Sequence, residues 1–445
     1  MVFHSELNRS DMLDRLTELL FDFAFFYPLL MSYLWMTGAL LYYYRHERGK
    51  RYTNPPRLPE YPLVSVLVPC YNESSNAIET FTALADMHYP NYEILAINDG
   101  SSDDTGDQLE ALARTIPRMR VVQLATNQGK AVALKAGAMA ARGEFLVCID
   151  GDAILDHYAV TWIMSHFLRD HRVGAVTGNP CIRTRSTLLG RIQVGEFSAI
   201  VGLLKRAQQM YGRLFTISGV IGAFRRRALH SVGYWNELTI TEDIDISWRL
   251  QLNNWDVHFE PHALCWILMP ETLVGLFKQR LRWAMGGAEA FKNYCHYLFS
   301  WRVRRFWPIF IEYMASIIWS YTILLLMGIG LFKLATPFPE PFFSFPYTGL
   351  ILGVTCLFQF AVCFFMARKY DSNMGGIYLE IIWYPLFYWL LSWIVSIIAF
   401  PKAMFFSNGK KRGRWHTTDR GIGSEPDKNT TLLQNDKSNE IGKTK

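Results

Sequence analysis

The sequence lacks the features that stabilise small secreted domains or structural metal sites. Its seven cysteines are an odd number, form no CxxC pair and have no histidine at ligand spacing, which excludes a disulfide framework and a zinc site. The first 19 residues have neither the basic start nor the small-residue cleavage site of a signal peptide. The net charge is only +6, and the lysines and arginines flank apolar runs instead of forming one basic stripe. We therefore expect no nucleic-acid partner.

Long apolar runs dominate what is present. Half of the 445 residues are hydrophobic and 15% are aromatic, and the apolar residues concentrate at 20–44 and 307–400. Runs of this length predict a membrane protein with a soluble middle. The predicted divisions are a polar N-terminal segment (1–19), a transmembrane helix (20–44), a basic and proline-containing linker (45–62), a soluble domain (63–270), interfacial helices (271–306), a block of about three transmembrane segments at 307–331, 347–366 and 377–400, and a basic, then disordered tail (401–445).

Basic residues beside the apolar runs predict which side of the membrane each part faces. Arg45, Arg48 and Lys50 follow the first run, so the positive-inside rule places the soluble domain in the cytoplasm. One crossing before this domain and three after it would leave the basic tail outside, against the same rule. Either one late stretch is interfacial or re-entrant, for example the one containing Pro385, or the rule fails at this end. A multi-pass chain in contact with the lipid bilayer is expected in each case.

The soluble segment alternates short strands with helices, and the two types are told apart by the period of their apolar residues. The predicted strands are 63–68, 92–97, 120–124 and 145–149, and the predicted helices between them lie near 76–87 and 130–141. This alternation is typical of βαβ units. The predicted fold class is therefore an α/β domain with a mostly parallel sheet and transmembrane α-helices at both ends.

Two carboxylates follow the predicted strand at 145–149. Asp150 and Asp152 are spaced i, i+2, so both can face one ligand from an extended segment. Ligands of open α/β sheets bind beyond the carboxyl ends of the strands, and two oxygen donors there suit Mg²⁺ or Mn²⁺ shared with a substrate phosphate. The alternative is an Asp-Gly-Asp turn without a ligand. We predict that Asp150 and Asp152 bind the metal at a nucleoside-diphosphate site.

Two more polar residues are expected near this site. Asp99 follows the strand at 92–97, where it faces the ligand crevice, forms an Asx-type turn or helix cap with Ser101 and Ser102, or does both. Lys130 opens a helix whose N-terminus can meet phosphate. The preceding loop is no Walker A motif, because the required glycine and Ser or Thr are absent.

Acidic residues open a later predicted helix, at Thr241-Glu242-Asp243. A carboxylate here can act as the base that deprotonates an acceptor hydroxyl, and Asp243 is the candidate. Glu242 and Asp245 are alternatives, because acids in a first helical turn ordinarily interact with the helix dipole.

A tryptophan and two arginines lie close together on the predicted helix at 271–292. Gln279, Arg282 and Trp283 fall at i, i+3 and i+4 and share one face, whereas Arg280 is expected to point elsewhere. An indole can stack on a sugar ring, and Arg282 can clamp phosphate oxygens. The alternative is an interfacial amphipathic helix with a belt of Trp and Arg.

Together these patterns resemble the D, DxD, ED and QxxRW motifs of the processive inverting family-two glycosyltransferases, in order and in spacing, over about residues 63–290. The resemblance implies a GT-A-type domain, Asp243 as catalytic base and a uridine contact at Asp99. With the residue patterns, it assigns the UDP-sugar to Asp99, Lys130, Asp150, Asp152, Gln279 and Arg282, and the acceptor to Glu242 and Trp283.

Longer passages, such as Gly178-Asn179-Pro180 and Cys265-Trp266-Ile267-Leu268-Met269-Pro270-Glu271-Thr272, resemble the bacterial poly-β-1,6-N-acetylglucosamine synthases of biofilm matrix. This resemblance extends over nearly the whole chain after residue 20. It implies UDP-N-acetylglucosamine as donor, a growing polysaccharide as acceptor, the bacterial inner membrane as location, and synthesis coupled to export. It also implies a small membrane partner subunit and control by cyclic di-GMP.

Three alternatives stay open at this point. One is a polysaccharide synthase of the hyaluronan, chitin or cellulose type, and a second is a non-processive transferase that acts on a lipid phosphate. The third belongs to another class, a membrane transporter or sensor that binds nucleotide without chemistry. It gives no reason for Gln279, Arg282 and Trp283 to share a helix face after an acid at 243.

Overall fold

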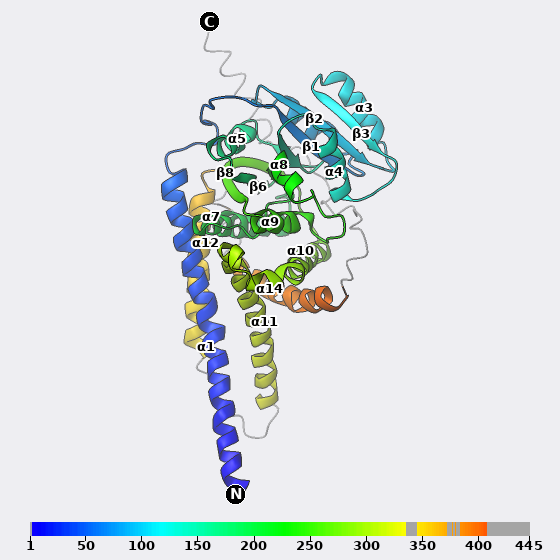
Figure 1. The fold of residues 1–445 in the computed structure, drawn as a ribbon. Coiled ribbons are helices and arrows are strands. Elements are labelled where there is room, and N and C mark those ends of the chain that lie inside the picture. The colour runs from blue at the N-terminus through cyan, green and yellow to red at the C-terminus, as the bar shows by residue number, and fades with distance from the viewer. Residues whose placement is uncertain (1, 335–344, 372–375, 377–378, 380–382, 407–445) are drawn as a thin grey trace.

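Three long helices carry the α/β domain at one end (Figure 1). The structure is a computed structural model that describes residues 2–334, 345–371, 376, 379 and 383–406. The long helices are α1 (Val2–Tyr42), α11 (Trp307–Leu334) and α12 (Phe345–Ala367). Helix α1 contacts both of the others. Within the described residues, three segments are long and apolar enough to cross a membrane, Arg15–Glu47, Trp301–Phe332 and Tyr347–Ala367.

The first helix is longer than the apolar run at 20–44. Helix α1 begins at Val2, so residues 2–19 of the segment that was expected only to be polar continue the same helix toward the N-terminus. The leucines and charged residues of this segment are good helix formers, and no proline or glycine precedes Pro28. A π-helical turn, Tyr43–Glu47, then connects α1 to the linker.

The last apolar stretch differs from the other two. Helix α14 (Tyr384–Pro401) has 18 residues, and Pro385 lies in its first turn, where a proline fits although it would not fit the interior of a helix. It packs against α10 (Leu273–Tyr294) and lies across the base of the domain instead of beside α1 (Figure 1). The alternative in which the stretch with Pro385 is interfacial stays a prediction. Part of the predicted segment 377–400 and the tail from 407 lie outside the described residues.

One eight-stranded sheet forms the domain, in the order β3-β2-β1-β4-β7-β6-β8-β5. The strands are β1 (Val64–Cys70), β2 (Tyr92–Asp99), β3 (Met119–Leu124), β4 (Phe145–Ile149), β5 (Ile154–Leu155), β6 (Val173–Ile182), β7 (Ile221–Arg225) and β8 (Asp256–Ile267). Strands β3, β2, β1 and β4 are parallel, as predicted, and β6 pairs with β8 in parallel. Strand β7 is antiparallel to β4 and β6, and β5 to β8, so this half of the sheet is mixed.

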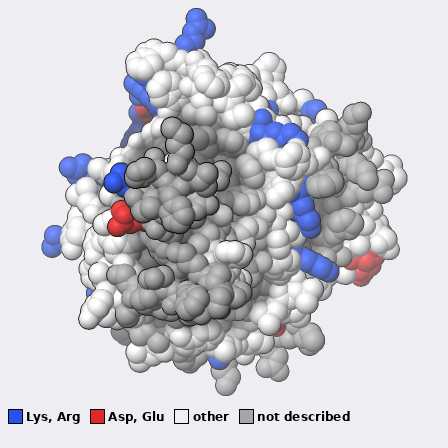
Figure 2. All heavy atoms as spheres, turned by 90° about the horizontal axis from the view of Figure 1, so that it is seen from below, with Lys and Arg blue, Asp and Glu red and all other residues white. Residues whose placement is uncertain are grey.

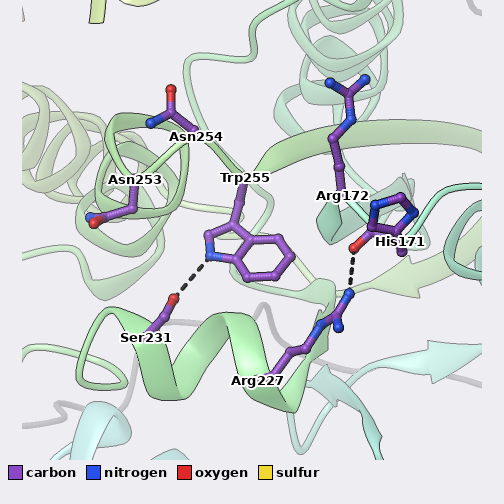
Figure 3. Close-up of a pocket in the computed structure, with 7 residues that line it drawn as sticks. All are labelled: His171, Arg172, Arg227, Ser231, Asn253, Asn254 and Trp255. Carbon is purple, nitrogen blue, oxygen red and sulfur yellow. Dashed lines mark hydrogen bonds between the residues drawn. The ribbon is translucent and has the colours of Figure 1, made fainter. Parts of the chain in front are cut away.

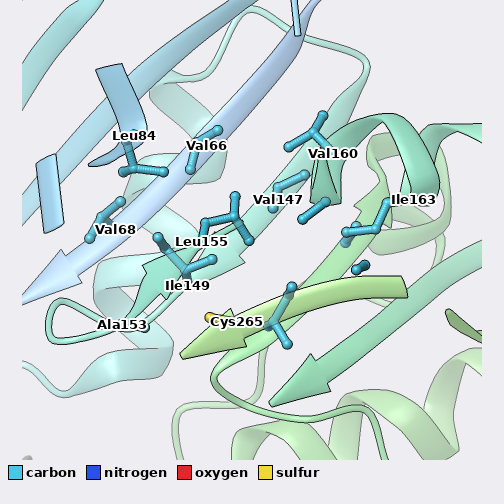
Figure 4. Packing of buried hydrophobic residues seen from close by; sticks show 14 of the residues in the cluster. Val66, Val68, Leu84, Val147, Ile149, Ala153, Leu155, Val160, Ile163 and Cys265 are labelled. Carbon is cyan, nitrogen blue, oxygen red and sulfur yellow. The ribbon is translucent and has the colours of Figure 1, made fainter. Parts of the chain in front are cut away.

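Helices cover both faces of the sheet. The remaining helices of the domain are α2 (Ala77–Ala85), α3 (Thr105–Thr115), α4 (Lys130–Ala140), α5 (Ala159–Arg169), α6 (Leu188–Phe197), α7 (Lys205–Tyr211), α8 (Arg226–Ser231) and α9 (Glu242–Leu252). Alternate strand residues face opposite sides. Val66 of β1 and Val147 of β4 pack with Val160 and Ile163 of α5 (Figure 4). Leu146, which directly precedes Val147, packs on the other face with α4 and α9.

This arrangement positions the candidate site. Strands β1, β2 and β4 are parallel, so their carboxyl ends lie at one edge of the sheet. Asp99 ends β2, and Asp150 directly follows β4. Helices α9 and α10, which carry the later motifs, contact each other. Gly286 permits this contact, because a Cβ at that position would lie 2.0 Å from Oγ1 of Thr241.

Candidate active site

Lys130, at the start of α4, joins the acids of two motifs. Its ammonium forms an ion pair with Asp150, lies 3.5 Å from Oε1 of Glu242 and donates a hydrogen bond of 3.0 Å to the carbonyl oxygen of Gly219. Burial alone would lower the pKa of Lys130, but the nearby carboxylates of Asp150 and Glu242 raise it above the usual range. The structure therefore places a permanent positive charge between the Asp-Gly-Asp motif and the start of α9.

Asp243 lies at the same centre and is largely enclosed. Its Oδ1 accepts the N–H of Ile244 at 2.9 Å, and a Cβ added to Gly219 would lie 2.9 Å from its Oδ2, so only glycine fits there without displacing the carboxylate. Burial and the charge of Glu242 raise the pKa of Asp243 to about 6, although the charges of Lys130 and Arg282 lower it. A carboxylate that ionises near neutral pH is suited to act as a general base.

Asp99 binds the backbone of the loop that precedes Lys130. Its side chain is fully buried, and its two oxygens accept the backbone N–H groups of Gln128 at 2.9 Å and Gly129 at 2.8 Å. Gly129 has a φ of +93°, which favours glycine, and Lys130 follows it directly. Asp99 thus fixes the loop that presents Lys130. Its expected contact with uridine stays a prediction.

The expected pairing of Asp99 with Ser101 and Ser102 is wrong. Ser101 donates from its N–H at 3.1 Å and from its hydroxyl at 2.6 Å to Oδ1 of Asn98, and the N–H of Ser102 donates to Oδ1 of Asn72 at 2.9 Å. Side chains alternate along a strand, so Asn98 and Asp99 face opposite ways, and the neighbour of Asp99 makes the Asx-type turn.

Asp150 and Asp152 fit a divalent ion that a substrate helps to bind. Both are partly exposed, and they follow β4 at positions i and i+2, which places them near each other. Within the described part of the chain, no three His, Cys, Asp or Glu side chains gather closely enough to hold an ion alone. Mg²⁺ is commonly held by one or two carboxylates together with substrate phosphates and waters. Two carboxylates at a strand end are sufficient for that kind of site.

Arg280 is central to the later motif, although its side chain was expected to point away from it. Its guanidinium is buried against Glu196 of α6, with a hydrogen bond of 2.7 Å, and donates to Oε1 of Gln279 at 2.8 Å. The guanidinium carbon lies 4.3 Å from the ring centre of Trp283. Arg282 is exposed instead, and its charge acts on Asp243. Residues 280 and 283 lie at i and i+3 and are therefore neighbours on the helix, and the arginine side chain is long enough to reach the indole ring.

Arg280→Met is expected to destabilise the protein by about 3–5 kcal/mol, because it leaves the carboxylate of Glu196, 1% exposed, buried without its partner. It also removes the cation that holds the ring of Trp283, the residue predicted to bind the acceptor, so we expect a higher KM for the acceptor. Thermal unfolding in detergent measures the first effect. The double variant Arg280→Met with Glu196→Met should recover most of the stability, and equal losses in the single and double variants would contradict this role of the pair.

A cavity of about 430 Å³ opens elsewhere on the domain, around Trp255, Arg227 and His171 (Figure 3). It lies where β6 and β8 begin, and β6 runs in the same direction as β4 because both are antiparallel to β7. The cavity is therefore at the opposite edge of the sheet from Asp150. None of the candidate site residues lines it, and we do not assign it to the donor.

Comparison with known proteins identifies the family of the chain. The family described as glycosyltransferase like family 2 matches residues 59–286. The poly-β-1,6-N-acetyl-D-glucosamine synthases of Staphylococcus epidermidis strain RP62A and Staphylococcus aureus strain COL are 36% and 37% identical over 422 and 413 residues, and each match covers 90% of this chain and 98% of the relative.

A solved structure shares the fold. The mannosyltransferase of Pyrobaculum calidifontis in complex with GDP-Man and Mn²⁺ aligns over 87% of this chain and 99% of its own, with a TM-score of 0.59 and 20% identity. The predicted glycosyltransferase domain joined to membrane helices is confirmed, and an enzyme replaces the alternative of a transporter or sensor without chemistry. The chain belongs to glycosyltransferase-like family 2, in the same family as the staphylococcal poly-β-1,6-N-acetyl-D-glucosamine synthases.

Proposed function

We propose that this membrane enzyme polymerises N-acetylglucosamine from UDP-N-acetylglucosamine into a β-1,6-linked polysaccharide by inverting transfer. The observation that carries the proposal is the meeting of Asp150, Lys130, Glu242 and Asp243 at the carboxyl end of β4. The identity to the two staphylococcal synthases over 90% of the chain supports the choice of sugar and linkage.

The donor half of the site consists of cationic and carboxylate groups. Asp150 and Asp152 would hold Mg²⁺ or Mn²⁺ against the diphosphate. The bound ion would offset the negative charge that the leaving UDP acquires. Lys130, paired with Asp150, adds a fixed positive charge beside it, and the exposed guanidinium of Arg282 can bind a phosphate oxygen. Asp99 keeps the Lys130 loop in place.

The acceptor half provides the base and a ring surface. The acceptor hydroxyl oxygen attacks C1 of the donor sugar from the face opposite UDP, the C1–O bond to UDP breaks, and the hydroxyl proton moves to Asp243. Inversion at C1 follows from attack on that face. Trp283 is partly exposed and held by Arg280, so its indole can stack on the acceptor sugar, with Glu242 beside the base.

A panel of UDP-sugars tests the donor assignment. In membranes that contain the full chain and Mg²⁺, UDP release is expected with UDP-N-acetylglucosamine and at least about tenfold less with UDP-glucose. A pocket built to hydrogen-bond a substituent discriminates strongly against the sugar that lacks it. Membranes without the chain are the control. Release with UDP-glucose alone would overturn the substrate assignment in favour of a cellulose-type synthase.

We also propose that the domain faces the cytoplasm of a bacterial inner membrane and that transfer is coupled to export. Three crossings would return the chain to the domain side after α12, where α14 lies across its base (Figure 1). Seen from the far end of the helices, most of the described surface is uncharged, with scattered Lys and Arg and few acids (Figure 2). Lys292 of α10 donates to the carbonyl oxygens of Ala403 and Met404, so the helix that carries Trp283 is attached to the segment that follows α14.

Inverted membrane vesicles given external UDP-N-acetylglucosamine test the coupling. Polymer made inside the vesicles, protected from added hydrolase until detergent is added, is the expected result, and fully accessible polymer would contradict it. The small partner subunit and control by cyclic di-GMP stay predictions from the family resemblance.

A further inference from the structure

A buried lysine near the catalytic centre has no role in the mechanism above. Lys205 begins α7, directly after the π-helical segment Ser198–Leu204, and is 7% exposed. No carboxylate of the described residues lies within ion-pair distance of it. Its ammonium donates one hydrogen bond, of 3.3 Å, to the hydroxyl of Thr177, and lies 6.0 Å from the ring centre of Phe259. Burying an ammonium with so few partners is costly.

Thr177 connects Lys205 to the loop at 218–221. Its hydroxyl accepts the N–H of Ser218 at 2.9 Å and donates to the carbonyl oxygen of Ile221 at 3.2 Å, so it fixes both ends of this loop. Between those ends lies Gly219, which approaches the carboxylate of Asp243 and accepts a hydrogen bond from Lys130. Lys205 is thereby linked to the base through a single side chain and one turn of backbone.

The charge of Lys205 also acts on Asp243. Burial lowers the pKa of Lys205 to about 7, and the negative charge of Asp243 raises it in part. The charges with the largest effects on the pKa of Asp243 are those of Glu242 from α9, Lys130 from α4 and Arg282 from α10, and the effect of Lys205 is smaller than theirs. Below pH 7 Lys205 is cationic, and a cation favours the ionised carboxylate. Because the pKa of Asp243 is about 6, the lysine is charged over the range in which this base ionises.

We propose that Lys205 is a positioning residue for sugar transfer: through Thr177 it holds the 218–221 loop against Asp243, and its buried positive charge keeps Asp243 deprotonated and ready to accept the acceptor proton. The proposal rests on the proposed function of Asp243 as the base. Among the described residues, Lys205 is the only cationic side chain that donates a hydrogen bond to Thr177.

The test is the dependence of kcat on pH, measured as UDP release from UDP-N-acetylglucosamine between pH 5 and 8.5 by the full chain in membranes. Lys205→Met is expected to move the acid limb to higher pH by about half a unit or more, and to lower kcat severalfold below pH 7. Lys205→Arg keeps the charge and should restore the limb. Lys135→Met is the matched control, because Lys135 is a partly exposed lysine of α4 paired with Glu237. Its limb should coincide with that of the unchanged chain.

Stability separates this role from a purely structural one. Methionine is similar in length and has no charge to desolvate, so Lys205→Met should unfold at the same or a higher temperature while its acid limb moves. Lys205→Gln, which can still donate to Thr177, is the second uncharged variant and should shift the limb in the same direction. Acid limbs of both variants that coincide with that of the unchanged chain would overturn the inference. If Asp243→Asn retained full activity, the proposed base would fail instead.

Discussion

Replacing Asp243 by asparagine is expected to lower kcat for sugar transfer by about 10²- to 10⁴-fold, which is the usual contribution of a positioned general base. Asparagine keeps the size of the side chain but cannot take the acceptor proton. The affinity for UDP-N-acetylglucosamine should change much less, because the residues proposed to bind the diphosphate are Asp150, Asp152 and Lys130. Single-turnover transfer and equilibrium binding of the donor, measured on the same membranes, separate the two effects.

The unchanged chain should lose activity as the pH falls through about 6, the pKa of Asp243, because the base is protonated below that value. Asp245→Asn is the matched control on the same helix. Asp245 accepts hydrogen bonds from Arg249 at 2.7 Å and Tyr294 at 2.6 Å, so its loss should reduce stability and leave the acid limb in place. Wild-type rates in Asp243→Asn would show that another group removes the proton.

Lys130→Met is expected to reduce kcat/KM by about 10²-fold or more, equivalent to about 3 kcal/mol. The substitution leaves the carboxylates of Asp150, Glu242 and Asp243 next to one another without the cation that separates them. Since Lys130 lowers the pKa of Asp243, its removal should also move the remaining activity to higher pH. Titration of UDP-N-acetylglucosamine in the presence of Mg²⁺ should show weaker donor binding.

Two variants make the result for Lys130 specific. Lys130→Arg keeps the charge and should retain part of the activity, although the planar guanidinium cannot reproduce the contact of a compact ammonium with Gly219. Lys135→Met, on the same helix, should behave like the unchanged chain. If Lys130→Met bound the donor as tightly as the unchanged chain and kept its pH profile, Lys130 would have no part in the transfer site.

The strands and the shared edge of the sheet could be predicted from the sequence because their signals are local. Short apolar runs that end in Asp99 and Asp150 determine both the strand type and the strand ends. The meeting of Asp150 with Glu242 depends on contacts between distant segments, and it could be anticipated only from the order of the motifs. The structure supplies the reason for the meeting, which is the cation of Lys130 between them.

Other parts required the tertiary structure. Arg280 and Trp283 lie at i and i+3, so helical spacing allows their contact, but the partner Glu196 comes from another helix and had no sequence signal. Apolar length left open whether the stretch at 377–400 crosses the membrane or is interfacial, and its packing against α10 depends on contacts with a distant segment. Lys205 belongs to no motif, and lysines are rarely buried, so no sequence signal pointed to it.

The most direct measurement of the central claim is the product itself. Membranes that contain the full chain, supplied with radiolabelled UDP-N-acetylglucosamine and Mg²⁺, should build labelled polymer that a β-1,6-specific hexosaminidase degrades and a chitinase leaves intact, and Asp243→Asn membranes should build none. Donor binding without incorporated label, or a polymer cut only by chitinase, would contradict it.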